Sequence, residues 1–167
     1  DLDEALGFVG FDDVYFVDDN ALVDVDRFLK IAAWFEGRRQ TYQLQGVEVS
    51  DLMDLSDDHL AFLERSGCKR MSLGVETGSA VMRKRLGKRG TPDDVIQVAQ
   101  RMKRYDITLY CSFMTALPDE TEADLHATLD LHGRLPKINP RIRTSPLYNY
   151  NPYPGTPLYK RAIQGGF

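Results

Sequence analysis

Carboxylates stand at the ends of three of the five short apolar runs in this sequence. Asp18 and Asp19 follow the first run, Glu48 lies at the end of the second, and Glu76 follows the third. Carboxylates can hold a cationic group and accept hydrogen bonds from hydroxyls. If the runs are parallel strands, their carboxyl ends meet at one face, where function resides in open sheets and barrels alike. The sequence therefore predicts an acidic active-site rim.

The elements that must position this rim are predicted from the hydrophobic pattern. Runs rich in β-branched and aromatic residues indicate strands, and longer amphipathic stretches indicate helices. Thr91 and Pro92 followed by acids form a helix start, and Gly67 is a typical helix end. The predicted strands are residues 14–17, 41–49, 70–75, 107–115 and 142–148, and the predicted helices are residues 24–38, a helix ending at Gly67, residues 91–104 and residues 121–135.

Strands that alternate with helices indicate βαβ crossovers and a parallel sheet. Five strands fit an open Rossmann-type sheet or an arc of a barrel. No glycine-rich dinucleotide fingerprint follows a predicted strand, which disfavours the Rossmann alternative. The 167 residues suffice for a single domain, residues 1–167, with its own core.

Composition excludes several classes of function. A net charge of −4 disfavours a nucleic-acid-binding domain. No apolar run reaches the length of a membrane span and no signal peptide is present, so we expect a cytoplasmic protein. Cys68 and Cys111 lie in apolar contexts without metal-ligand spacing. Two buried thiols are the commoner arrangement for such a pair, with a disulfide as the alternative.

Several segments, in order, resemble the radical S-adenosylmethionine superfamily, and more closely its cobalamin-binding branch. Residues 15–20 are similar to the aspartate-rich end of the second barrel strand in that branch, and residues 70–79 to the fourth strand. Residues 88–91 follow at the family's spacing. Residues 113–121 resemble the fifth-strand motif GLPGET, and residues 153–159 the segment after the sixth strand.

The resemblance implies an α/β fold, an incomplete parallel (βα)6 partial TIM-like barrel lacking the first strand. In the family, a loop after that strand holds a [4Fe–4S] cluster through three cysteines, which this chain lacks. The cluster binds S-adenosylmethionine, and one electron from a donor such as flavodoxin or ferredoxin yields a 5′-deoxyadenosyl radical. The implied parent is thus a radical S-adenosylmethionine enzyme, with cobalamin as a further cofactor for methyl transfer, and the chain alone is expected to be inactive.

The resemblance also assigns roles to residues. Asp18 and Asp19 would receive the methionyl ammonium, Glu76 the ribose hydroxyls and Lys88 the methionyl carboxylate, a charge-assisted contact. Ser112 falls near the ribose, and the loop after the fourth predicted strand lies beside the adenine. The full set of implied cofactor-binding residues is Asp18, Asp19, Glu48, Glu76, Lys88, Ser112, Ala116, Leu117 and Tyr148.

Three positions depart from the family pattern. Ala116 and Asp119 stand where GLPGET has glycines, and Asp106 replaces a common glycine before a strand. Glycine at such places permits a left-handed backbone, which aspartate tolerates better than most residues. These departures bear on the adenine contacts.

Simpler structural roles compete with these assignments. Asp18 and Asp19 could cap the next helix, and Glu76 could form a structural ion pair. The basic run 82–89 reads as a solvated helix and turn in which Arg83 faces solvent, or else as an RNA-contacting patch, which the acidic net charge disfavours. The histidines are expected to be structural or exposed, and residues 136–140 to form a stiff connector.

Two rival functions remain open from the sequence. One is a non-catalytic barrel module that mediates interactions, and the other is a non-radical α/β enzyme acting on a phosphorylated metabolite. For the favoured enzyme we expect a small-molecule substrate of unknown class. The strand at residues 14–17 would have an open edge, which predicts a dimer formed through it.

Overall fold

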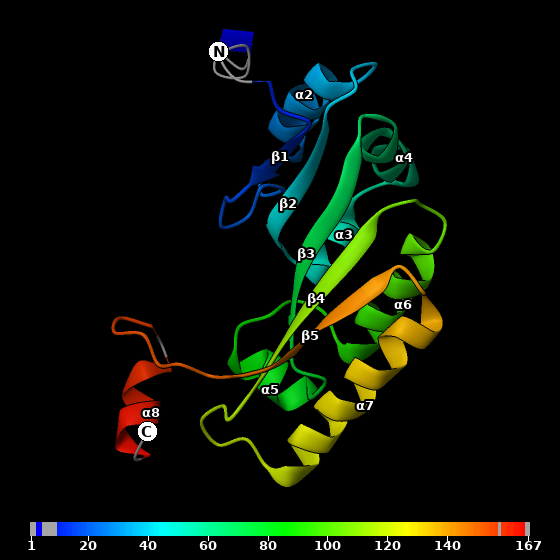
Figure 1. The fold of residues 1–167 in the computed structure, drawn as a ribbon. Helices are drawn as coiled ribbons and strands as arrows, with labels where there is room; N and C mark the ends of the chain where they lie inside the picture. The colour runs from blue at the N-terminus through cyan, green and yellow to red at the C-terminus, as the bar shows by residue number, and fades with distance from the viewer. Residues whose placement is uncertain (1–2, 5–9, 157, 166–167) are drawn as a thin grey trace.

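The computed structural model describes residues 3–4, 10–156 and 158–165. Five parallel strands form one sheet in chain order, β1-β2-β3-β4-β5, and the helices between them make the crossovers (Figure 1). The strands are β1 (Asp13–Phe16), β2 (Thr41–Val47), β3 (Cys68–Glu76), β4 (Thr108–Thr115) and β5 (Ile142–Asn149). The helices are α2 (Val25–Phe35), α3 (Val49–Asp54), α4 (Asp57–Arg65), α5 (Ala80–Arg85), α6 (Pro92–Met102), α7 (Glu122–Ile138) and α8 (Tyr159–Gln164). The expected partial barrel is confirmed.

The two faces of β3 explain how this sheet forms. Met71, Leu73 and Val75 alternate along one face and are buried in the core shared with the helices. Ser72 and Glu76 alternate with them on the opposite face and stay partly exposed. A period of two places these sets on opposite sides of the sheet. The apolar face therefore packs against the crossover helices, and the polar face is left for function.

Hydroxyl caps fix the starts of the helices near the functional end. Thr91 accepts from the backbone N–H of Asp94 at 3.2 Å before α6, and Thr121 accepts from that of Asp124 at 3.3 Å before α7. In each case the aspartate carboxylate accepts a hydrogen bond from the backbone N–H of the threonine. These are capping boxes, and the predicted start of the helix at Thr91 is confirmed.

Two predicted boundaries are wrong. Residues 48 and 49 do not extend β2, because the backbone N–H of Glu48 donates to Asp51 Oδ2 at 2.8 Å and starts the unpredicted helix α3. Pro136 lies inside α7 rather than in a connector. Leu135 is buried in the core and Ile138 packs against it, so burial keeps this last turn helical despite the lost N–H.

The cysteines and histidines are mostly structural. Cys68 and Cys111 are buried free thiols, as predicted. His132 Nε2 lies 2.9 Å from the carbonyl oxygen of Ser145, and its ring packs edge-on against Phe113. In the part of the chain that the structure describes, no helix is both long and apolar enough to cross a membrane.

Candidate functional site

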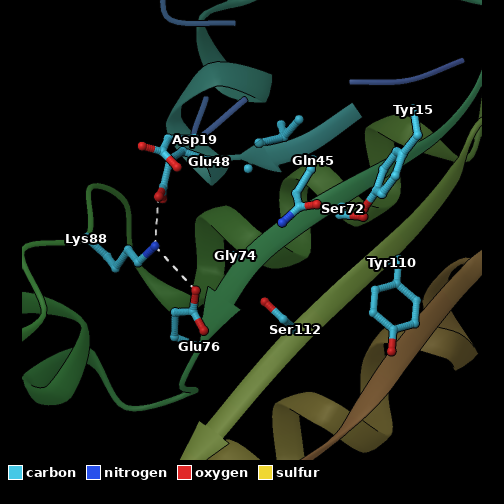
Figure 2. Close-up of a pocket in the computed structure, with 12 residues that line it drawn as sticks. Tyr15, Asp19, Gln45, Glu48, Ser72, Gly74, Glu76, Lys88, Tyr110 and Ser112 are labelled. Atoms are coloured by element: carbon cyan, nitrogen blue, oxygen red, sulfur yellow. Dashed lines mark hydrogen bonds and ion pairs between the residues drawn. The ribbon is translucent and has the colours of Figure 1, made fainter. Parts of the chain in front are cut away.

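A pocket of about 400 Å³ opens at the carboxyl end of the sheet, on its polar face. A volume of this size suits a small-molecule ligand. Side chains of β1 to β4 and of the connections that follow β1, β2 and α5 surround it (Figure 2). Its lining residues are Tyr15, Asp19, Gln45, Gly46, Val47, Glu48, Ser72, Gly74, Glu76, Lys88, Tyr110 and Ser112.

Lys88 lies between two carboxylates at the wall of this pocket. Its Nζ is 2.7 Å from Glu48 Oε1 and 3.4 Å from Glu76 Oε1, as Figure 2 shows. Glu48 precedes α3, Glu76 ends β3, and Lys88 follows α5. All three side chains are at least two-thirds buried. The sheet thus gathers two acids and one base from three separate elements.

Glu76 holds an unusual backbone conformation. Its φ is 66°, in the left-handed region that non-glycine residues rarely adopt. Burial raises the pKa of its carboxyl above the ordinary value, and the neighbouring Lys88 opposes that shift in part. A strained, desolvated carboxylate at a strand end is a common feature of functional sites.

Lys88 reaches the pocket because α5 ends in a defined way. The backbone N–H of Lys88 donates to the carbonyl of Arg83 at 3.0 Å, and that of Gly87 to the carbonyl of Lys84 at 3.1 Å. With Gly87 at a φ of 71°, this is the Schellman pattern of helix ends. The chain turns sharply there, which directs Lys88 toward the carboxyl end of the sheet.

The predicted exposure of Arg83 is wrong. Its side chain is 1% exposed and donates to three backbone carbonyls. Lys84, Arg85 and Arg89 of the same run are exposed, although Arg85 donates to the carbonyl of Asp119 and Arg89 pairs with Asp54. The run is therefore divided between Arg83, which is buried, and three exposed basic side chains.

Two glycines allow the pocket wall to close. A Cβ at Gly46 would lie 2.0 Å from the carbonyl oxygen of Asp19, so the loop after β1 rests directly on the backbone of β2. A Cβ at Gly74 would lie 2.8 Å from Glu76 Oε1 and 3.1 Å from Lys88 Nζ. The missing side chain at position 74 leaves the space in which the Glu76–Lys88 pair sits.

Five of the nine predicted site residues line the pocket, namely Asp19, Glu48, Glu76, Lys88 and Ser112. The other four do not. Asp18 lines a separate hollow beside α2, and Leu117 is buried. Ala116 lies in the loop after β4, and Tyr148 is 55% exposed.

Sequence reasoning missed several lining residues. Tyr15, Gln45, Ser72 and Tyr110 lie within strands, not at their ends. The period of two along β3 and β4 could have placed Ser72 and Tyr110 on the face that carries Glu76 and Ser112. The pairing of Gly74 with Ser112 brings these two polar rows side by side.

The loop after β4 contains two further non-glycine residues in the left-handed region. Ala116 has a φ of 57° and Asp119 a φ of 62°, as expected at positions where the family motif has glycines. Among the described residues other than glycine, Glu76 is the third with a positive φ, so the left-handed turn expected at Asp106 is not formed. Asp106 is held instead by Glu64, which accepts from its N–H, and by Arg141 at 3.0 Å.

The cysteines do not fit an iron–sulfur cluster. Both thiols are buried among the apolar side chains between the sheet and the helices. Burial raises the pKa of the Cys68 thiol and raises that of Cys111 to about 12, whereas cluster ligands are thiolates. Within residues 3–4, 10–156 and 158–165, no three metal-binding side chains form a group.

Comparisons with known proteins agree with this architecture. A tRNA-2-methylthio-N(6)-dimethylallyladenosine synthase of Roseobacter denitrificans is 36% identical over 94 residues, which are 55% of this chain and 20% of that protein. The solved structure of the radical S-adenosylmethionine methyltransferase TsrM from Kitasatospora setae has a TM-score of 0.65 at 15% identity, over 79% of this chain and 25% of that one. The cobalamin-dependent enzyme OxsB, solved with aqua-cobalamin and S-adenosylmethionine bound, has a TM-score of 0.64 at 16% identity, over 98% and 23%.

The chain spans only about a fifth of the length of the Roseobacter relative. The two solved structures, each less than 20% identical, establish a shared fold. The family assignment comes from the sequence model of the Radical SAM superfamily, which matches residues 4–132. This match covers most of the chain, and the chain therefore belongs to the radical S-adenosylmethionine superfamily.

Proposed function

We propose that the pocket is the S-adenosylmethionine site of a radical S-adenosylmethionine enzyme. The observation that carries this proposal is Lys88 held between Glu48 and Glu76 at the carboxyl end of the sheet. Lys88 would bind the methionyl carboxylate, and Glu76 the ribose hydroxyls, with Ser112 nearby. Asp19 and Glu48 would receive the methionyl ammonium.

The charges of the pocket suit this ligand. S-adenosylmethionine has one carboxylate and two cationic groups, the ammonium and the sulfonium. The pocket offers Lys88 to the former and the carboxylates of Asp19, Glu48 and Glu76 to the latter. On binding, Lys88 would exchange part of its pairing with the glutamates for the ligand carboxylate, and the glutamates would gain cationic and hydroxyl partners.

The same charges disfavour one rival function. A phosphorylated metabolite would meet three carboxylates and a single lysine, and like charges that are partly buried repel strongly. A non-catalytic module that retained the pocket would still bind S-adenosylmethionine. It would differ from an enzyme by yielding no cleavage product.

The reaction that we propose for the whole protein is reductive cleavage of S-adenosylmethionine to a 5′-deoxyadenosyl radical, with an electron donor such as flavodoxin or ferredoxin. We assign none of the residues described above to the [4Fe–4S] cluster, because neither cysteine fits it. Cobalamin-dependent methyl transfer is the form of this chemistry that the likeness to TsrM and OxsB supports.

We propose a small molecule as the substrate. The Roseobacter relative is named for a tRNA modification, but part of the basic run that could contact RNA is engaged within this protein. Arg83 is buried and Lys88 faces the pocket, which leaves Lys84, Arg85 and Arg89 for phosphate contacts. Together with the net charge of −4, this favours a substrate other than nucleic acid.

Binding of S-adenosylmethionine tests the proposal directly. In the full-length protein, kept anaerobic and without reductant so that no turnover occurs, Glu76→Ala and Lys88→Ala should each weaken binding about ten- to a hundredfold, the range for losing a hydrogen bond to a charged group. Lys84→Ala, on the exposed side of α5, is the matched control and should change little. Wild-type affinity in both pocket variants would remove these assignments.

A further inference from the structure

Arg83 does not line the pocket, and it is among the largest fully buried side chains of the described residues. Its Nη1 donates to the carbonyl of Val75 at 2.6 Å, its Nε to that of Gly90 at 2.9 Å and its Nη2 to that of Arg89 at 3.0 Å. No carboxylate of the described residues forms an ion pair with it. A buried guanidinium held only by carbonyls is costly to desolvate.

The three carbonyls flank the two residues that meet at the pocket. Val75 immediately precedes Glu76, while Arg89 and Gly90 follow Lys88. The carbonyl of Arg83 itself accepts from the backbone N–H of Lys88. The buried side chain of Arg83 thus links the end of β3 to the segment after α5. The backbone carbonyl of Arg83 also binds the N–H of Lys88.

Both tied segments need such a restraint. Glu76 has a strained φ, and the segment around Lys88 includes Gly87 and Gly90 at φ values of 71° and 82°. Glycines at positive φ form sharp turns at the cost of greater freedom in the unfolded chain. Without the hydrogen bonds of Arg83, the backbone around Lys88 could adopt several conformations, and the Lys88 side chain would not be held in one position. Ligand affinity is higher when the binding groups are held in position before the ligand binds.

The charge of Arg83 also favours ionised partners. Glu48 and Glu76 oppose the fall in the pKa of Arg83 that burial causes, and Arg83 in turn favours the charged form of Glu76. Arg83 therefore supports the charged form of Glu76, although it is not one of the residues that line the pocket.

We propose that Arg83 is a positioning residue for S-adenosylmethionine binding, which acts by fixing Glu76 and Lys88 relative to each other. This inference rests on the proposed function of the pocket. It assigns a specific role to a residue that contacts no ligand, and it predicts an effect on binding that passes through Lys88.

A double-mutant cycle in the full-length protein tests it, with S-adenosylmethionine binding measured without reductant and thermal unfolding measured in parallel. Arg83→Met removes the donors and keeps the length of the side chain. Arg101→Met is the control, since Arg101 likewise donates to backbone carbonyls, those of Leu52 and Leu55 at 2.7 Å, and pairs with Asp57 at 2.6 Å, away from the pocket. Both variants should lower the unfolding temperature.

Only Arg83→Met should weaken binding, by about tenfold, within the usual range for coupled residues. In a Lys88→Met background the same change should cost clearly less than tenfold, about threefold, because the part of its effect that passes through Lys88 is lost while the part that passes through Glu76 remains. Arg83→Lys, which keeps the charge and can reach one carbonyl, should restore part of the affinity. Wild-type affinity in Arg83→Met, or full additivity with Lys88→Met, would overturn the inference.

Two further outcomes are distinct. If the wild-type protein does not bind S-adenosylmethionine, the proposed function fails, and the role of Arg83 fails with it. If Lys88→Met weakens binding but Arg83→Met does not, only the role of Arg83 fails. If Arg83→Met does not fold, the affinity of Arg83→Lys for S-adenosylmethionine is compared with that of the wild type. Unchanged affinity in Arg83→Lys would contradict the inference that Arg83 fixes Glu76 and Lys88 relative to each other.

Discussion

The segments that follow β3 and β4 leave the sheet in the same way and serve different ends. Each begins with a non-glycine residue in the left-handed region, Glu76 at a φ of 66° and Ala116 at a φ of 57°. Each leads to a helix with a hydroxyl N-cap, Ser79 before α5 and Thr121 before α7. The two segments therefore share a left-handed residue at the strand end and a hydroxyl cap at the start of the next helix.

The carboxylates of the two segments differ in what they bind. After β3, Glu76 lies in the pocket against Lys88. After β4, Glu120 turns back on its own segment, where Oε2 accepts from the backbone N–H of Ala116 at 2.7 Å and from the hydroxyl of Thr115 at 2.9 Å. One carboxylate is thus available to a ligand and the other holds a loop, and substitutions should separate these roles.

The largest expected effect is on stability in the β4 segment. Glu120→Ala removes the acceptor of two hydrogen bonds and leaves the N–H of Ala116 without its partner, which should lower the free energy of unfolding by about 2–3 kcal/mol. Urea titration measures this. Glu122→Ala, whose side chain is 89% exposed, is the control and should have little effect. Equal stability of the two variants would contradict a structural role for Glu120.

The second effect is a pH dependence confined to the β3 segment. Burial raises the pKa of Glu76, so the folded protein keeps a proton that the unfolded chain releases. The resulting stability is present at low pH and is lost as the pH rises through the raised pKa. Glu76→Gln should therefore gain stability relative to wild type over that interval, while it weakens S-adenosylmethionine binding.

Thermal unfolding from about pH 4 to pH 8 would show this gain, since ordinary carboxyl groups titrate near the lower end of that range. Glu122→Gln should show no such trend, because Glu122 is exposed. If the unfolding temperatures of Glu76→Gln and wild type differed by the same amount at every pH, burial would not raise the pKa of the Glu76 carboxyl.

The smallest effect concerns backbone strain. Ala116→Gly should raise stability by about 0.5 kcal/mol, because relief of the left-handed strain slightly exceeds the entropy cost of glycine. Ala123→Gly, in the first turn of α7, should instead lower it by about 0.5–1 kcal/mol. Calorimetry on both variants tests the sign. A loss of stability in Ala116→Gly would show that the strain is not released.

The sequence was informative where local patterns decide the structure. The apolar runs predicted the five strands in their observed order, and the Thr91 cap predicted the start of α6. The position of carboxylates after strands predicted Glu48, Glu76 and Asp19 at one pocket. These predictions needed only the period of the strands and the geometry of a parallel sheet.

Tertiary contacts decided what the sequence did not show. Arg83 sits in a run of charges that reads as solvated, and only the carbonyls of Val75, Arg89 and Gly90, brought together by folding, explain its burial. The sequence pattern predicts that Glu48 extends a strand, but its backbone N–H donates to Asp51 and a helix begins there. The assigned ligand roles, the single-domain boundary and dimerisation through β1 stay predictions.

The strand order has a consequence for how the chain acquires its structure. Each strand pairs with the next one along the chain, as in Tyr42 with Cys68 and Leu109 with Ile142. Every pairing therefore closes a loop of one βα unit, and loop-closure entropy stays modest throughout. During synthesis from the N-terminus, each completed unit presents the edge on which the next strand docks. The residues of the pocket would then be brought together in the order in which they are translated, with Lys88 added after both of its glutamate partners.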